Sequence, residues 1–258
     1  MSGYKYLFGP VPSRRLGASL GVSPIPERTC NYSCVYCQLG RTLRMTNTRQ
    51  EFFPLEEILA EFREYLQGSI PFDVVTVVGE GEPTLYSRLG ELIAGLKKET
   101  DKPAAVITNG ALLYDAEMRR ELMEADIVLP SLDAVTEEQY RKIDRPMGSI
   151  GFAEMAEGLR QFAREYQGQL WIEIMLVDGM NDSPEDIAAF KEFLGTIDYD
   201  RVYLNTPVRP PAEGFVHTSA PERIDLAARE LGGISIDQLT SGSFFLFFPR
   251  RGVETVQG

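Results

Sequence analysis

The sequence contains one histidine in 258 residues, and this scarcity removes several classes of enzyme. Metal sites with two histidines, HExxH helices and catalytic triads that draw on several histidines would all have to be built around His217. That residue stands in the stretch EGFVHTSAP, whose small and polar residues favour a surface loop. We therefore expect His217 to be a solvated loop residue.

Long apolar runs are also missing. No segment approaches the roughly 18 consecutive apolar residues of a membrane span. The N-terminal stretch MSGYKYLFGP lacks the apolar core of a signal peptide. These absences predict a cytoplasmic protein that does not enter a membrane. The composition is otherwise ordinary, with 43% hydrophobic residues, and a chain of this length can bury one large core.

Cysteine is scarce as well, and the three that are present, Cys30, Cys34 and Cys37, occupy eight consecutive positions in CNYSCVYC. Cysteines so close together cannot form disulfides that link distant parts of a fold. In a reducing compartment they indicate metal binding or redox chemistry. A four-iron cluster ordinarily takes four thiolates, so three would leave one iron open to a small molecule. The alternatives are zinc, for which further ligands are lacking, and a redox pair of Cys34 with Cys37.

Short β-branched runs alternate with amphipathic segments along the chain. We predict strands at residues 16–24, 72–79, 103–110, 125–133, 170–179 and 200–208. We predict helices at residues 54–67, 88–99, 115–125, 152–166, 183–195 and 220–232. Six strand–helix pairs of this kind form a parallel barrel or a doubly wound sheet in one domain, residues 1–258. Its core is expected at about residues 16–232, and residues 233–258 hold a last strand, in SGSFFLFFPRRGVETVQG, and a tail.

Small polar residues and glycines follow the predicted strands at their carboxyl ends. The cysteine loop comes after the first strand, GEGEPT (79–84) after the second, TNG (108–110) after the third and SLD (131–133) after the fourth. The fifth strand carries Glu173, and the sixth ends in NTPV (205–208). Because the carboxyl ends of parallel strands meet at one rim of the sheet, we expect a ligand to bind there.

The spacing Cys-x3-Cys-x2-Cys, with Tyr36 before the last cysteine, resembles the signature of the radical S-adenosylmethionine (SAM) superfamily. The stretches GPVPSRRLGASLGV, GEGEPTL, EIMLVDGMND and LNTPVRPP resemble small members grouped with wyosine tRNA-modification synthases. The resemblance implies a partial (βα)6 TIM-like barrel and a [4Fe-4S] cluster held by the three cysteines. It also implies that SAM binds the open iron and is cleaved to a 5′-deoxyadenosyl radical, which abstracts a hydrogen atom from a substrate.

The same resemblance assigns residues to SAM. Gly81 and Glu82 match a Gly-Gly-Glu motif that receives the SAM ammonium group, although Glu80 departs from it. Ribose or carboxylate contacts are expected from Thr108, Asn109, Ser131 and Asp133, whose alternative role is in turns and helix caps. Adenine contacts are expected from Tyr36, Asn205 and Val208, for which a core or turn role is equally compatible.

Glu173 interrupts the apolar run WIEIMLV, and a carboxylate in a buried strand is costly unless it has a partner. A ribose hydroxyl or an ammonium group of the cofactor would supply that partner. The alternative is a structural salt bridge to an arginine.

Charge is unevenly distributed. The chain has a net charge of −12, yet residues 1–50 hold seven Lys or Arg against one acidic residue, a net charge of +6. We expect six arginines to line the substrate site and to suit a carboxylate or phosphate, unless they are merely solvated: Arg14, Arg15, Arg41, Arg44, Arg145 and Arg209. The expected partners are a reduced flavodoxin or ferredoxin and a small anionic or protein substrate, while the net charge disfavours nucleic acid.

Two functions of different classes fit these patterns. The first is a radical SAM enzyme of unknown substrate, with a glycyl-radical-enzyme activase as one alternative within that class. The second is an iron–sulfur electron-transfer or structural cluster protein without SAM chemistry. The strand-end motifs favour the first, because an electron carrier needs no acceptors for ribose or ammonium. An auxiliary cluster is excluded, since no further cysteines remain to bind one.

Overall fold

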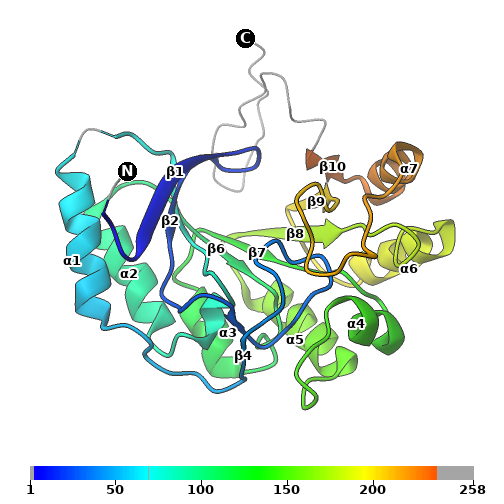
Figure 1. The fold of residues 1–258 in the computed structure, drawn as a ribbon, viewed down its shortest axis with the longest axis horizontal. Coiled ribbons are helices and arrows are strands. Elements are labelled where there is room, and N and C mark those ends of the chain that lie inside the picture. Colours follow the sequence, from blue (N-terminus) through cyan, green and yellow to red (C-terminus); the bar gives the residue numbers. More distant parts are fainter. Residues whose placement is uncertain (1–2, 69, 237–258) are drawn as a thin grey trace, which may run out of the picture.

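The structure is a computed structural model that describes residues 3–68 and 70–236 (Figure 1). Its main sheet has the strand order β1-β2-β5-β6-β7-β8-β9-β10. These strands are β1 Leu7–Ser13, β2 Gly17–Val22, β5 Val74–Val77, β6 Ala104–Thr108, β7 Ile127–Pro130, β8 Gln169–Met175, β9 Arg201–Asn205 and β10 Ile234–Ser235. A separate two-stranded ribbon is formed by β3 Thr29–Cys30 and β4 Arg44–Met45.

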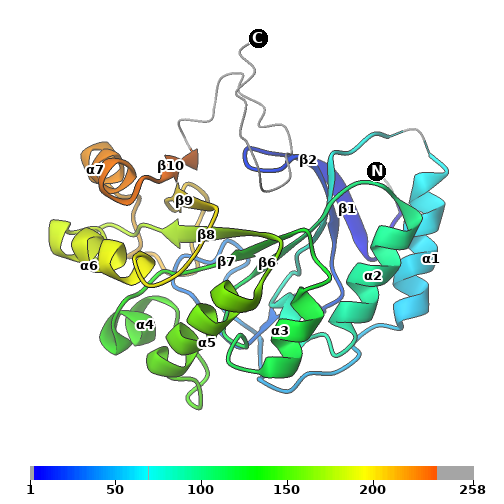
Figure 2. The same cartoon turned by 180° about the vertical axis from the view of Figure 1, so that it is seen from behind.

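Helices connect the strands and cover the outside of the sheet (Figures 1 and 2). They are α1 Leu55–Leu66, α2 Leu89–Glu99, α3 Ala116–Leu122, α4 Glu137–Ile143, α5 Phe152–Glu165, α6 Pro184–Leu194 and α7 Pro221–Leu231, with a short 3₁₀ turn, η1 Pro83–Leu85. All strand pairs from β2 to β10 are parallel, and only β1 pairs antiparallel, with β2. The two edges, β1 and β10, are not paired with each other among the residues described, so the barrel is open on one side.

The six predicted strand–helix pairs are all present, so the (βα)6 barrel-like prediction is confirmed. In α1, for example, Ile58, Leu59 and Phe62 are buried against the sheet, as the apolar stripe predicts. Pro54 was expected as the first helical residue and instead lies one position earlier, at the N-cap. Its missing N–H costs nothing in either place, because the first turn of a helix has no acceptor for it.

Several elements were not predicted, and the two longest of them are β1 and α4. Strand β1 forms a hairpin with β2 before residue 16, and helix α4 precedes α5 in the connection from β7 to β8. The sequence LFGPVPS of β1 contains a glycine and two prolines, which are poor strand formers and are tolerated at a sheet edge. The strand predicted within residues 241–258 lies outside the described residues.

The inside of the barrel is apolar near the amino ends of the strands. Leu16, Val74, Ile127 and Trp171 are among the residues of a buried cluster there, distinct from the larger core between sheet and helices. Side chains therefore fill this end of the barrel, which directs a ligand to the carboxyl ends of the strands. None of the described helices combines the length and the apolar composition that crossing a bilayer would require.

Candidate active site at the carboxyl ends of the strands

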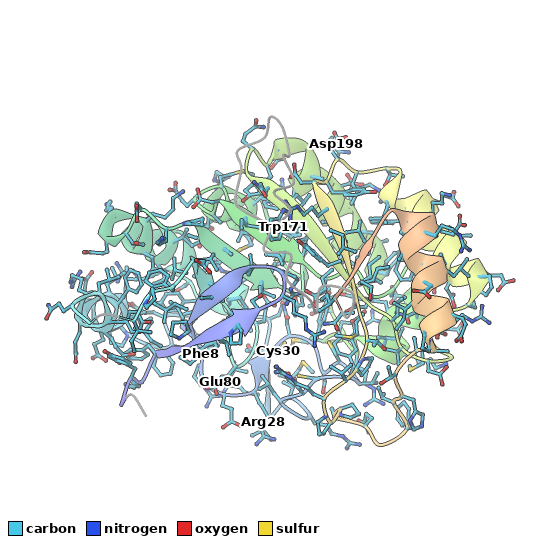
Figure 3. All side chains as sticks on the ribbon, turned by 90° about the horizontal axis from the view of Figure 1, so that it is seen from above. Phe8, Arg28, Cys30, Glu80, Trp171 and Asp198 are labelled. Atoms are coloured by element: carbon cyan, nitrogen blue, oxygen red, sulfur yellow. The ribbon has the colours of Figure 1, made fainter. Side chains whose placement is uncertain are left out.

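The cysteine loop follows β2 and is tied to the loop after β5 by backbone hydrogen bonds. Arg28 N–H donates to the Glu80 carbonyl at 2.5 Å, and Glu82 N–H donates to the Thr29 carbonyl at 3.0 Å. Figure 3 accordingly shows Arg28, Cys30 and Glu80 on the same side of the molecule. The cysteine stretch and the GEGEPT stretch, 49 residues apart at their first residues, thus form one unit.

Gly81 is required by this contact. A Cβ atom at this position would lie 1.8 Å from the Thr29 carbonyl oxygen and 2.7 Å from its carbon. Both are backbone atoms, so no side-chain rotation could relieve the clash. The sequence predicted Gly81 as a SAM contact, and that role stays a prediction. The structure adds a packing reason for glycine that the motif alone did not provide.

The three cysteines are free thiols and are half-buried. Burial raises the pKa of Cys30 to about 12 and raises the pKa of both Cys34 and Cys37 above the ordinary value. Cys30 Sγ accepts hydrogen bonds from Tyr32 N–H at 3.3 Å and from Asn109 Nδ2 at 3.6 Å. A buried thiolate therefore needs positive charge, which a bound metal centre supplies, and donors already point at one sulfur.

Over residues 3–68 and 70–236, no three His, Cys, Asp or Glu side chains are grouped as ligands of a single metal ion. Zinc requires four ligands around one point, and the zinc alternative stays an untested prediction. An iron–sulfur cluster makes a different demand, because each thiolate binds a separate iron of a larger group. The donor set of three free thiols fits that demand.

Glu82 is buried and accepts four hydrogen bonds. Its Oε1 accepts from Thr84 N–H at 3.0 Å and from the hydroxyls of Thr84 and Thr108, each at 2.6 Å. Its Oε2 accepts from Asn109 N–H at 2.8 Å. Burial raises the pKa of this carboxyl, while these hydrogen bonds oppose the rise. The carboxylate thus joins the ends of β5 and β6, and only Oε2 retains room for another donor such as an ammonium group.

Thr108 and Asn109, both predicted as SAM contacts, are engaged within the protein. The Thr108 hydroxyl is bonded to Glu82, and Asn109 Nδ2 donates to Asn31 Oδ1 at 2.8 Å. Asn109 Oδ1 accepts from Ala111 N–H at 2.9 Å. These contacts correspond to the alternative role that the sequence left open, in which such residues shape turns. Their contact with SAM stays a prediction.

Asp133 and Tyr36 are brought together from distant parts of the chain. The Tyr36 hydroxyl donates to Asp133 Oδ2, and Met175 N–H donates to Asp133 Oδ1 at 2.7 Å. Burial raises the pKa of Asp133 to about 6. Asp144 lies 3.8 Å from the Cys34 sulfur and is also buried, so its pKa is raised well above the ordinary value. Sequence analysis missed Asp144, because nothing in RKIDRP separates a buried aspartate from a helix-terminal one.

Glu173 forms an ion pair with Arg15, the second of the two alternatives considered for it. Asn205 Nδ2 also donates to Glu173 Oε1 at 3.3 Å. Both members of the pair are largely buried, with side-chain exposures of 17% and 14%. A buried ion pair is weak evidence for stability, because desolvation offsets most of the attraction. Arg14, the neighbour of Arg15, donates to the Ile236 carbonyl at 3.2 Å.

Ser131 differs from the other predicted SAM residues. It lies directly after β7, and its backbone bridges Glu173 on the neighbouring strand. Its half-buried hydroxyl makes no hydrogen bond to any residue that the structure describes. Ser131 is therefore available to a ligand without breaking a contact of the protein.

The loop between β9 and α7 is fastened to the cysteine loop. Glu213 N–H donates to the Val35 carbonyl at 3.1 Å, and its carboxylate binds Arg41 at 2.9 Å and Arg145 at 2.5 Å. Arg209 Nη1 donates to Gln38 Oε1 at 2.5 Å. Arg145 and Arg209 thus have protein partners beside the cysteines, and their predicted contact with substrate is not tested.

The remaining predicted residues lie at the margin of the site. Val208 is 62% exposed in the loop after β9. His217 is exposed in the same loop, as expected, and its carbonyl accepts from Asp178 N–H at 3.2 Å.

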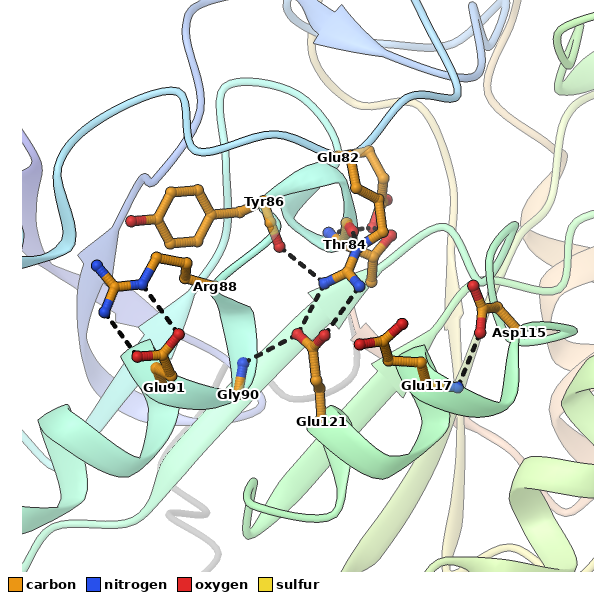
Figure 4. Close-up of polar contacts among 10 residues, drawn as sticks. Glu82, Thr84, Tyr86, Arg88, Gly90, Glu91, Asp115, Glu117 and Glu121 are labelled. Carbon is orange, nitrogen blue, oxygen red and sulfur yellow. Dashed lines mark hydrogen bonds and ion pairs between the residues drawn. The ribbon is translucent and has the colours of Figure 1, made fainter.

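Arg49 is a structural residue that sequence analysis missed. It donates to the carbonyls of Thr84 and Tyr86 at 3.0 and 2.9 Å and forms an ion pair with Glu121 of α3 at 2.7 Å. Figure 4 shows the partners Thr84, Tyr86 and Glu121 near Glu82. The network attaches the segment that follows the cysteine loop to η1. No local pattern distinguishes Arg49 from a solvated arginine, because its partners are 35 to 72 residues away.

Comparison with known proteins identifies the family and several relatives of this chain. The model of the Radical SAM superfamily matches residues 25–191. The chain is 37% identical over 226 residues to a UPF0026 protein of Methanocaldococcus jannaschii, covering 87% of this chain and 69% of that protein. It is 43% identical over 205 residues to a protein of Brachyspira hyodysenteriae named GTPase Obg, covering 80% of this chain but only 30% of that longer protein.

Solved structures show the same fold at low identity. A radical SAM methyltransferase from Sphaerobacter thermophilus matches with a TM-score of 0.66 and 18% identity, covering 84% of this chain and 65% of that chain. The structure of anSMEcpe with bound AdoMet matches with a TM-score of 0.61 and 18% identity, covering 83% and 59%. With a family match over most of the chain and three free cysteines at the rim of a partial barrel, the protein belongs to the radical SAM superfamily.

Proposed function

We propose that this protein is an enzyme that binds a [4Fe-4S] cluster through Cys30, Cys34 and Cys37 and uses SAM at that cluster. When bound, the reduced cluster supplies the electron that splits SAM into methionine and a 5′-deoxyadenosyl radical, which takes a hydrogen atom from the substrate. The observation that carries the proposal is that all three cysteines of the chain are free thiols on one loop at the carboxyl rim of the sheet.

The chain's own residues divide into supports and contacts. Gly81, Glu82 and Asn109 hold the cysteine loop against the strand ends, as their hydrogen bonds and close packing indicate. Glu82 Oε2 and the Ser131 hydroxyl are two polar groups with unused bonding capacity. We assign Glu82 to the SAM ammonium and Ser131 to a ribose hydroxyl or the carboxylate.

The substrate lies, in this proposal, on the inner side of the barrel near the Arg15–Glu173 pair. Breaking a buried ion pair is costly because one charge is left unpaired, so a ligand would have to bind Arg15 while the pair with Glu173 is kept. A small anionic molecule fits Arg15, and a protein substrate, as for an activase, is the alternative.

Cleavage of SAM is the test of this function. We expect anaerobically reconstituted protein, reduced with dithionite, to form 5′-deoxyadenosine slowly without added substrate, as measured by liquid chromatography. If SAM binds and no 5′-deoxyadenosine forms under strong reductant, the protein is a cluster protein of another kind.

Ser131→Ala should weaken SAM binding without loss of stability. Its hydroxyl has no partner among the described residues, so the folded protein loses nothing, while the ligand loses one hydrogen bond. One neutral hydrogen bond is worth about 0.5–1.5 kcal/mol, so the dissociation constant for SAM should rise about 2- to 12-fold. Isothermal titration and thermal melting measure the two effects. Thr108→Val is the matched comparison, since it removes a hydroxyl bonded to Glu82 and should lower the melting temperature.

A further inference from the structure

The two-stranded ribbon contains the first cysteine, Cys30, in β3 and an exposed strand, β4. Cys30 of β3 is paired in register with Met45 of β4, and Thr46 N–H donates to the Cys30 carbonyl at 3.1 Å. In the described part of the chain β4 pairs only with β3, so its other edge is open. Cys30, a residue of the proposed cluster site, therefore lies one strand spacing, about 4.8 Å, from the outer strand β4.

The exposed edge, Leu43–Met45, is apolar on both sides of a positive charge. Leu43 is 69% exposed and Met45 is 41% exposed, and Arg44 between them is exposed as well. Single exposed apolar residues are normal on protein surfaces. Here, however, two of the eight large exposed hydrophobic side chains that the structure describes flank one arginine on a strand that pairs with a cysteine.

The charge of this region is opposite to that of the whole chain. Residues 28–50 contain four arginines and no acidic residue, whereas the protein carries −12. Arg28 is paired with Glu27, Arg41 with Glu213 and Arg49 with Glu121. The guanidinium group of Arg44 has no hydrogen-bond or ion-pair partner among the described residues, although its backbone N–H donates to the Arg28 carbonyl. It is the positive charge that this surface leaves free for a partner.

We propose that the Leu43–Met45 edge is the docking site for a small acidic protein that carries a reduced one-electron centre. The proposal rests on the proposed function, which requires an electron to reach the cysteine site. One electron leaves the partner's centre, which is oxidised, and reduces the cluster. The apolar side chains provide contact area, and Arg44 steers the acidic partner to this face, because the rest of the protein repels it.

The docking site is tested by reversing the charge of Arg44 and measuring the rate of 5′-deoxyadenosine formation with two electron donors. With a reduced acidic flavodoxin as donor, Arg44→Glu should lower the rate of 5′-deoxyadenosine formation about tenfold at low salt, while the rate with dithionite is unchanged. Leu43→Ser should act in the same direction without changing charge. Arg229→Glu is the matched control: it reverses an arginine that is 69% exposed on α7, and its effect should be small with either donor.

Binding supplies a readout that needs no turnover. We expect the reconstituted protein to bind immobilised flavodoxin with an affinity that falls as salt rises, and Arg44→Glu to weaken that binding about tenfold. Equal loss of rate with flavodoxin and dithionite, or no loss with either, would overturn the docking site. Absence of 5′-deoxyadenosine from the wild type with dithionite would instead count against the proposed function.

A nucleic-acid role for the same surface is the competing outcome. The net charge of −12 predicts no tight binding of tRNA at physiological salt. If bulk tRNA binds with micromolar or tighter affinity at about 0.15 M salt, and Arg44→Glu abolishes that binding, the edge recognises phosphates and the electron-donor proposal is wrong.

Discussion

Replacement of Cys34 by Ala should leave a folded protein that retains almost no iron after anaerobic reconstitution and forms no measurable 5′-deoxyadenosine. The chain has no fourth cysteine to substitute, so the loss of one thiolate removes a third of the proposed ligand set. Mutation of residues that only support metal ligands typically costs about 10- to 100-fold in affinity or activity. Loss of a ligand itself should therefore exceed about a hundredfold.

Iron analysis, the visible absorption of the cluster and 5′-deoxyadenosine assays measure this loss. Thr48→Ala is a suitable control, because Thr48 is exposed on the same segment and its side chain makes no hydrogen bond to any residue that the structure describes. Ala at Cys30 or Cys37 should reproduce the result. A triple Ala variant that still holds a full complement of iron would end the cluster assignment.

Gly81→Ala should destabilise the protein and reduce iron binding together. Its Cβ would lie 1.8 Å from the Thr29 carbonyl oxygen, so either the GEGEPT loop or the cysteine loop must move. Overpacking typically costs about 1–3 kcal/mol, and a backbone clash belongs at the upper end. About 3 kcal/mol corresponds to a melting temperature roughly 6–12 °C lower in a domain of this size.

Differential scanning calorimetry and iron content are the measurements for this variant. Gly148→Ala is the matched control, since no atom lies within 4 Å of its added Cβ and its backbone conformation is accessible to alanine. It should melt within about 1–2 °C of the wild type. If Gly81→Ala melts with the control and binds iron normally, the contact between the two loops does not hold the cysteines in place.

The sequence by itself determined the fold class and predicted an iron–sulfur cluster, which we propose as the cofactor. Six βα units were predicted because strands and helices have different periods of apolar residues. This pattern lies within each segment and does not depend on distant residues. A cluster site was predicted because the three cysteines are close in sequence and their spacing is typical of such a site. Strand β1 was not predicted, since LFGPVPS has no strand preference and is held by its pairing with β2.

Only the tertiary structure decided what most polar rim residues contact. Glu82 joins β5 to β6, Glu173 pairs with Arg15 across 158 positions of sequence, and Asp144 lies beside Cys34 although 110 positions separate them. A glutamate or an arginine has the same local signature whether it is solvated or paired, because its partner is set by the register of strands far apart in the chain. The same register places Met45 beside Cys30.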